Sequence, residues 1–348
     1  MGYGNGSVPH SDSKASRGAV QFCSPFRSII DHWRVIDMKT KVAHKKPLGK
    51  RILDRWQLYL LMILPLAALI IFSYIPMSGL VLAFKKYRVG MTIAEAPWVG
   101  WDNFKKFFGS YKFTTILKNT LTLSFYQLAV FPIPIIFALM LNAMLGKHYK
   151  KTIQTVTYLP YFISTVVMIG IVLQVLNERT GLYGALWRRI VGTQAPSIIG
   201  NAKAFRHVYV WSGVWQSTGY SAVIYLAALS GVDPNLHEAA MIDGASRFQI
   251  VVHIDLPAIL PTVSIMFILA IGGIMGIGVE KSLLLQNSIN MPYSEIISTY
   301  EYKVGLSGTV PMDFSLSTTI GLFNSVVNFI LLLTADKITK KLSGSGIF

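Results

Sequence analysis

The most informative residue spacing in the chain lies in a polar stretch that separates two long apolar runs. Asp233 followed by Pro234 is typical of a helix start, because the carboxylate caps free N–H groups and proline suits the first turn. Gly244 supplies a C-terminal stop, and Ser246 with Gln249 forms a capping box that begins a second helix. The spacing therefore predicts a short, well-bounded helix that is attached firmly to the next apolar run.

The side chains of this short helix suit a docking element that passes on motion. Ala239 and Ala240 offer a small apolar surface for close approach, while Glu238 and Asp243 offer charge that fixes the register of a contact. The alternative is an amphipathic helix that rests on the membrane surface, because short capped helices are common. The spacing of these residues alone leaves both interpretations open.

The sequence offers little catalytic or metal-binding chemistry. It has one cysteine, Cys23, so a disulfide within the chain is impossible, and its seven histidines are scattered without H-x-x-x-H or C-x-x-C spacing. We find no G-x-x-x-x-G-K-[ST] nucleotide motif, no nucleophile elbow and no paired carboxylates near the membrane surface. We therefore expect a chain that is not an enzyme and that holds no metal or cofactor of its own.

Long apolar runs must position these residues. The chain has 348 residues, of which 52% are apolar and 14% charged, and its mean hydropathy is +0.49. A spanning helix needs about 20 apolar residues, and lipid cannot satisfy free backbone groups, which favours helices. We therefore predict an all-α integral membrane protein with six transmembrane helices. The predicted spans are 58–84, 120–145, 156–176, 208–230, 258–279 and 316–335.

The excess of basic residues fits a membrane protein better than a nucleic-acid-binding protein. The formal net charge is +16, but the chain lacks the basic, aromatic-rich polar domain that nucleic acid would need. Lys and Arg are slightly enriched on the side of the N-terminus, which predicts cytoplasmic N- and C-termini. We expect a basic, partly disordered tail over 1–55, a membrane domain over 56–336 with a cytoplasmic loop at 231–257, and a C-terminal tail over 337–348.

The loop resembles the signature segment of permease subunits of ATP-binding-cassette (ABC) importers. The family pattern is E-A-A, three residues, G, nine residues and I-x-L-P, and this sequence matches its spacing throughout. The matching residues are Glu238, Ala239, Ala240, Gly244, Ile254, Leu256 and Pro257, with Asp243 and Ala245 completing the family's usual D-G-A. Segment 97–104 also resembles the family's first outer loop, and 74–85 the first span of the oligosaccharide branch. Segments 295–306 and 321–328 resemble the end of the polysaccharide-type permeases.

The resemblance implies a type I ABC importer permease fold in which this loop carries a coupling helix. The chain would pair with a second, similar permease, and two ATPase subunits holding ATP and Mg would each accept one loop helix. An extracytoplasmic solute-binding protein would deliver an oligosaccharide for transport across the bacterial cytoplasmic (inner) membrane. Basic predicted outer loops favour an anionic, alginate-type or other uronate cargo. They contain Lys105, Lys106, Lys112, Arg188, Arg189, Lys203 and Arg206.

A sugar site should combine aromatic faces with amide and hydroxyl groups. Gln216 and Tyr220 are the best candidate pair, because both lie mid-span and one helical turn apart. Each candidate has a structural alternative as an interface anchor or a helix-linking hydrogen bond. The candidates for the substrate path are Tyr126, Gln127, Trp215, Gln216, Tyr220 and Asn324.

Two further features bear on mechanism. Gly272 and Gly276 form a G-x-x-x-G pattern, which predicts close helix packing, with bending during gating as the alternative. A stand-alone secondary transporter or channel is the competing function. It would need repeated halves and ionisable residues at mid-membrane, whereas the predicted spans are nearly free of charge and the halves show no repeat.

Overall fold

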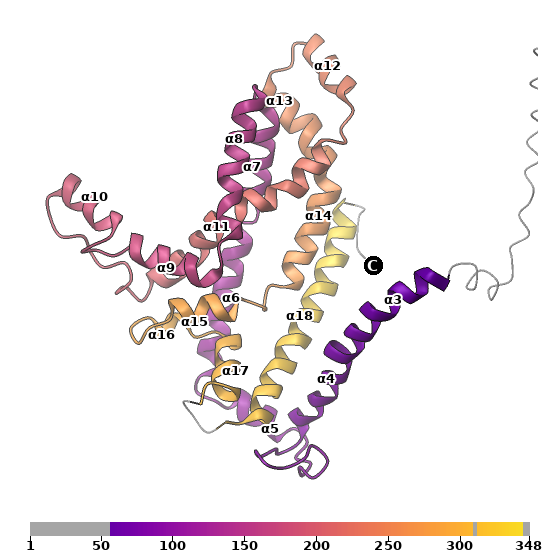
Figure 1. Cartoon of the computed structure of the whole chain (residues 1–348), viewed down its shortest axis with the longest axis vertical. Helices are drawn as coiled ribbons and strands as arrows, with labels where there is room; N and C mark the ends of the chain where they lie inside the picture. Colours follow the sequence, from indigo (N-terminus) through magenta and orange to yellow (C-terminus); the bar gives the residue numbers. More distant parts are fainter. Residues whose placement is uncertain (1–55, 309–311, 344–348) are drawn as a thin grey trace, which may run out of the picture. The chain divides into compact units, whose positions relative to one another are not determined.

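The computed structural model describes residues 56–308 and 312–343. The predicted N-terminal tail and the last five residues lie outside them. The chain divides into two units, 1–75 and 76–348, which we describe separately. All regular secondary structure in the described residues is helical, apart from an isolated bridge between Lys85 and Trp98 (Figure 1).

The first unit contains α3 (Trp56–Leu69), which continues into a π-helical turn at Ile70–Tyr74. Both segments are apolar on every side, and neither contains a buried residue. A helix that is hydrophobic all round requires an apolar surrounding. Helical structure extends to Phe84, so the first predicted span is confirmed as a 29-residue segment long and apolar enough to cross a membrane.

The second unit holds the remaining helices. The short α4 (Ile75–Met77) precedes them, and they are four to 30 residues long. They are α5 (Asp102–Phe108), α6 (Phe113–Ala129), α7 (Pro132–Ala143), α8 (Lys147–Tyr158), α9 (Thr165–Val175), α10 (Leu182–Val191), α11 (Ala204–Leu229), α12 (Pro234–Ile242), α13 (Arg247–Ile250), α14 (Leu256–Gly272), α15 (Val279–Leu285), α16 (Met291–Ser294), α17 (Ile297–Gly305) and α18 (Phe314–Ser343).

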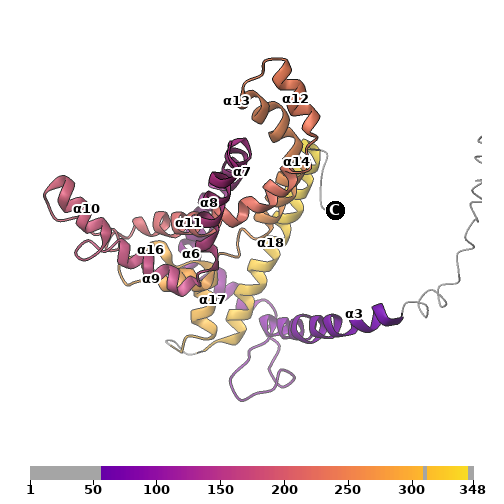
Figure 2. The same ribbon diagram turned by 45° about the horizontal axis from the view of Figure 1, so that its top comes forward.

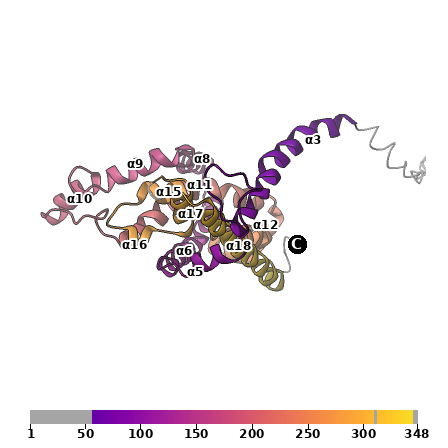
Figure 3. The same ribbon diagram turned by 90° about the horizontal axis from the view of Figure 1, so that it is seen from below.

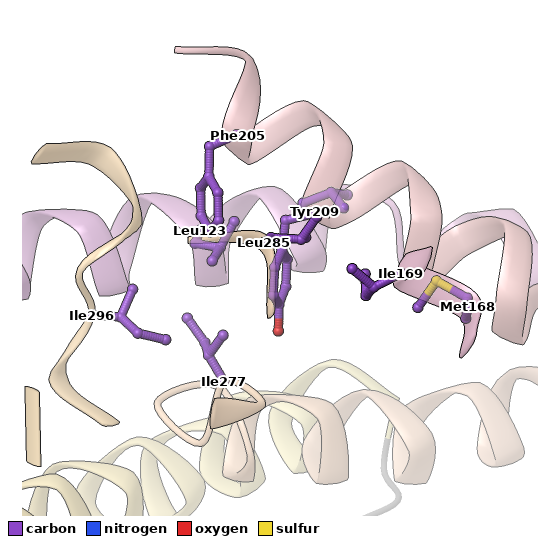
Figure 4. Packing of buried hydrophobic residues seen from close by; sticks show 9 residues of the cluster. Leu123, Met168, Ile169, Phe205, Tyr209, Ile277, Leu285 and Ile296 are labelled. Carbon is purple, nitrogen blue, oxygen red and sulfur yellow. The ribbon is translucent and has the colours of Figure 1, made fainter. Parts of the chain in front are cut away.

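Two helix pairs organise this unit: α7 packs along α11, and α14 packs along α18. Ile135 of α7, Ala222 of α11 and Ile259 of α14 belong to one buried cluster, so α14 shares a core with the first pair. A second cluster gathers Tyr209, Leu285 and other apolar residues from α6, α9, α11 and the segment after α14 (Figure 4). Seen from below, α17 lies beside α18 (Figure 3).

The two ends of α14 and α18 carry different structures. The short helices α12 and α13 lie at the end where α14 begins, whereas α5 and α17 lie at the end where α18 begins (Figures 1 and 2). The predicted cytoplasmic loop is therefore separated from 85–119 and 293–306 by the length of the long helices. This arrangement agrees with the predicted placement of these segments on opposite sides of a bilayer.

The predicted third span, 156–176, is bent, as expected for a span that contains Pro160. Lys147–Phe162 and Thr165–Val175 meet at an angle of 106°. The break follows Pro160, whose ring removes a backbone donor and favours a kink or an end of the helix. Ser164 then starts the next helix by accepting a hydrogen bond from the N–H of Val167 at 3.4 Å.

The number of spans stays a prediction. In the described part of the chain, four helical segments are long and apolar enough to cross a membrane, or five if the bent pair is one span. The predicted fourth span corresponds to the 26-residue α11, which is helical but is not among these segments. The predicted fifth span ends early, at Gly272 instead of 279, because closely spaced glycines after this point disfavour helix.

Candidate coupling segment and transmembrane cavity

Both ends of the helix α12 are capped by hydrogen bonds of neighbouring residues. Asp233 caps its start by accepting a hydrogen bond from the N–H of Asn235 at 3.0 Å. At its end, the N–H of Ala245 donates to Ala240 at 2.9 Å and that of Gly244 to Met241 at 3.1 Å. This pair of bonds is a Schellman motif, which satisfies carbonyls that the helix leaves free.

Gly244 is required for the shape of the backbone rather than for space. Its φ angle is +77°, in the left-handed region that L side chains rarely adopt, and a Cβ placed on it would meet no atom within 4 Å. The D-G-A sequence of the loop therefore has a structural reason. It ends α12 sharply and turns the chain back toward the membrane helix.

The connection to α14 is continuous. The predicted capping box is present: the N–H of Ser246 donates to Oε1 of Gln249 at 2.7 Å, and the N–H of Gln249 donates to Oγ of Ser246 at 3.4 Å. From Arg247 the helix runs without a break to Gly272, through a π-helical turn at Val251–Asp255. A displacement of the loop is therefore transmitted along a stiff element.

A buried carboxylate joins α12 to this element. Asp255 is 2% exposed, and its Oδ1 lies 2.9 Å from Nε2 of His237 on α12. Its Oδ2 accepts a hydrogen bond from the amide of Asn142, at the end of α7, at 3.4 Å. We call these three residues the Asp255 clasp. Sequence reasoning missed it because the family pattern leaves the position between Ile254 and Leu256 open, although a carboxylate in an apolar run was a visible signal.

The remaining face of α12 is exposed. No residue of this helix is buried. Glu238, in the middle of the helix, and Asp243, directly after its end, are both exposed. Ile242 is 86% exposed and Phe248, at the start of α13, is 76% exposed. Leu236 and Met241 are exposed as well, and exposed apolar surface of this kind commonly marks a contact with another protein.

The other predicted loop residues lie closer to the bundle. Ala239 is exposed and Ala240 half-buried on α12, and Ala245 is half-buried beyond its end. Leu256 packs against the buried cluster of α7, α11 and α14. Ile254 is half-buried within the π-helical turn, and Pro257 is exposed in the first turn of α14.

A cavity of about 760 Å³ lies among α6, α7, α11 and α14. Tyr161 and Tyr220 line it with rings stacked at a centroid distance of 3.9 Å and an angle of 8°. Gln127, Ser217 and Thr218 add amide and hydroxyl groups to the same wall. The cavity thus combines aromatic faces with polar groups, as expected for a sugar path.

The structure brings two of the six substrate candidates to this cavity, Gln127 and Tyr220. The amide of Gln216 instead donates to the carbonyl of Ile163 at 3.0 Å, at the break before α9. Trp215 lines a separate apolar groove between α9 and α11. A contact between Gln216 or Trp215 and substrate stays a prediction.

The other two candidates have different surroundings. The hydroxyl of Tyr126 accepts a hydrogen bond from Nε1 of Trp211 at 2.9 Å and lies 2.9 Å from Nδ1 of His207. The Oδ1 atom of Asn324 is buried without a hydrogen-bond partner in the described part of the chain. Neither residue lines the cavity among the long helices.

The two glycines of the G-x-x-x-G pattern occupy different structures. A Cβ on Gly272 would lie 2.5 Å from Cδ1 of Leu332, so this glycine allows α14 to approach α18 closely. Gly276 lies beyond the end of α14, in the turn before α15. The two residues therefore do not share one helix face.

A larger cavity, of about 1040 Å³, lies at the end of the unit opposite α12. Its basic residues outnumber its acidic ones, and ion pairs order part of the lining. Lys112 lies 3.2 Å and Lys303 3.6 Å from the carboxylate of Glu295. Burial lowers the pKa of Lys303, and the attraction of Glu295 opposes that change. The charged lining residues are Lys86, Arg88, Asp102, Lys106, Lys112, Glu295, Lys303 and Asp313.

Comparisons with known proteins agree with this architecture. Residues 111–344 match the model of the family described as binding-protein-dependent transport system inner membrane component. Protein LplB of Bacillus subtilis is 40% identical over 296 residues, which cover 85% of this chain and 92% of LplB. The polygalacturonan/rhamnogalacturonan transport system permease protein YteP of the same organism is 39% identical over 314 residues, covering 88% and 96%.

A solved structure extends the similarity to the fold. A chain of the bacterial alginate ABC transporter, crystallised with an alginate pentasaccharide-bound periplasmic protein, matches with a TM-score of 0.78 and 35% identity. The match covers 86% of this chain and 99% of that one. The fold is therefore that of a type I ABC importer permease. The chain belongs to the family of binding-protein-dependent transport system inner membrane components.

Proposed function

We propose that this chain is the membrane subunit through which an ABC importer moves oligosaccharides from a solute-binding protein into the cytoplasm. The single observation that carries the proposal is the construction of α12. This exposed helix ends in a Schellman motif, is followed by a helix that runs without a break from Arg247 to Gly272, and is held by the Asp255 clasp. Such a helix is suited to receiving motion from a partner and passing it to the membrane helices.

The partners follow from this role. Each of two ATPase subunits, which bind ATP and Mg, accepts one coupling helix in a cleft, and a second permease of similar fold supplies the other helix. Closing of the ATPase dimer moves the two helices together, and the bundle switches between two packings. The N- and C-termini and α12 lie on the cytoplasmic side, and the larger basic cavity faces the binding protein.

Oligosaccharide is the cargo that the cavity and the relatives support. The Tyr161–Tyr220 stack offers an apolar face for sugar C–H groups, and the neighbouring amide and hydroxyls offer hydrogen bonds. YteP is described as a polygalacturonan/rhamnogalacturonan transport permease, and the solved relative as an alginate transporter. Both substrates contain uronate sugars, which supports an acidic cargo for this chain.

Crosslinking and uptake test the proposal. In a background in which Cys23 is replaced by serine, Glu238→Cys should crosslink to a cysteine in the cleft of the ATPase partner, and the yield should change on adding ATP. A matched cysteine at Lys105, at the opposite end of the unit, should not crosslink. Absence of the Glu238 crosslink, or uptake by this chain alone driven by an ion gradient, would contradict the proposal.

A further inference from the structure

Lys281, near the start of α15, places its ammonium against Gly213, a residue that lines the cavity among the long helices. Its Nζ lies 4.6 Å from the centre of the Tyr209 ring. A Cβ built on Gly213, which lines the cavity, would lie only 2.9 Å from the same Nζ. The missing side chain at Gly213 therefore leaves the space that the ammonium occupies.

The charge of Lys281 is not balanced by an acidic residue. Lys105, Lys106, Lys112 and Lys303 all lie within 4 Å of a carboxylate, but Lys281 has no such partner in the described residues. A cation held away from water without an opposite charge is costly and commonly marks a path for ions or substrate. The Tyr209 ring offsets part of this cost through a cation–π contact.

Burial lowers the pKa of Lys281 to about 8. The ammonium is therefore still the main form at neutral pH, and a carboxylate that approaches it would favour that form further. Lys281 lies after the end of α14 and outside the segments long enough to cross a membrane.

We propose that Lys281, with Tyr209 beneath it and Gly213 beside it, forms a subsite for the carboxylate of an acidic sugar unit in the transport path. The inference rests on the proposed function and specifies the substrate class at one position. The ammonium would bind the carboxylate, while the Tyr161–Tyr220 stack and its polar neighbours would contact other sugar units. The subsite would favour uronate oligomers over neutral oligomers of equal length.

Equilibrium binding tests this subsite without relying on the solute-binding protein's own selectivity. The purified complex in nanodiscs would be titrated with a galacturonate tetramer and with the same tetramer reduced at its carboxyl groups. We expect Lys281→Gln to lower the preference for the acidic tetramer about tenfold, with little change for the neutral one. Lys281→Arg should keep most of the preference, and the exposed control Lys147→Gln, at the start of α8, should keep all of it.

A second variant probes the same geometry from the other helix. Gly213→Ala places a methyl group where the ammonium lies, so it should also weaken binding of the acidic tetramer more than that of the neutral one. An unchanged preference in Lys281→Gln would overturn the subsite while wild-type uptake still supports the importer. Wild-type complex that neither binds nor imports any oligosaccharide would instead reject the proposed function.

Discussion

The Nε2 atom of His237 and the buried Oδ1 atom of Asp255 lie 2.9 Å apart, although 18 positions separate the residues in the chain. One residue belongs to the exposed helix α12 and the other to the turn that leads into α14. Since no residue of α12 is buried, this contact is a principal tie between the helix and the membrane bundle. It gives the coupling helix a lateral attachment in addition to its connection along the chain.

Removing this tie should separate ATP hydrolysis from transport. Asp255→Asn keeps the size of the side chain but weakens its hydrogen bonds, which are worth about 1.5–3 kcal/mol where one group is charged. We expect the binding protein to stimulate ATPase activity severalfold less, with basal activity retained. The measurement is ATPase activity of the reconstituted complex with and without the binding protein.

The control for the clasp is His253→Ala, which removes an exposed histidine whose Nδ1 contacts the carbonyl of Gln249. It should leave the stimulation unchanged. His237→Asn combined with Asp255→Asn should cost less than the sum of the single changes, because the residues share one contact. Full stimulation in Asp255→Asn would show that the tie is dispensable.

The left-handed residue at the end of α12 gives a graded prediction. Gly244→Asn should be tolerated better than Gly244→Ala, since asparagine adopts positive φ more readily. We expect the alanine variant to lose about 1–2 kcal/mol of local stability and to lower uptake more strongly. Uptake into proteoliposomes and protease cleavage within the loop would measure the two effects.

Gly231→Ala is the matched control for Gly244, since its φ is not positive and the nearest atom to its Cβ would be the carbonyl oxygen of Ala228 at 3.4 Å. This variant should behave close to wild type. Equal losses in Gly231→Ala and Gly244→Ala would mean that backbone conformation is not the reason for the glycine.

The aromatic stack in the cavity should contribute to substrate affinity. Tyr220→Ala removes one ring of the Tyr161–Tyr220 pair, and aromatic pairs are worth about 0.5–1.5 kcal/mol beyond their buried area. We expect the KM for uptake to rise about three- to tenfold, while Tyr220→Phe, which keeps the ring, should stay near wild type. A similar KM in all three proteins would remove the stack from the substrate path.

Close packing between α14 and α18 should be sensitive to volume at Gly272. Gly272→Val crowds Leu332 and should lower the free energy of unfolding by about 1–3 kcal/mol, the usual cost of overpacking. Leu332→Ala in the same protein should recover part of this loss. Thermal unfolding in detergent gives the comparison, with Gly170→Ala, which would meet no atom within 4 Å, as the control. A loss that Leu332→Ala does not relieve would assign the effect elsewhere.

Local signals in the sequence predicted local structure well. The Asp233–Pro234 start, the Gly244 stop and the Ser246–Gln249 box depend on backbone groups a few residues away, and all three are present. Pro160 lies beside the bend of the third span, whereas helices continue through Pro65 and Pro261, so proline alone does not determine where a span bends.

Contacts between distant segments could not be read from spacing. The Asp255 clasp joins α7, α12 and the turn before α14, and the ammonium of Lys281 meets Gly213 only because α15 folds back on α11. Gln216 was a reasonable substrate candidate by residue type, yet its amide serves the carbonyl that the chain break leaves free. Residue type predicted the chemistry, and packing determined where it is used.

The length of the first helical segment can be compared with the thickness of the bilayer. At about 1.5 Å per residue, the 29 residues of Trp56–Phe84 would extend beyond 40 Å if fully α-helical, whereas a hydrocarbon core measures about 30 Å. The segment must therefore tilt or extend among the lipid headgroups. The position of this helix in the bilayer, and the protein's activity after reconstitution, should therefore depend on the acyl-chain length of the lipids.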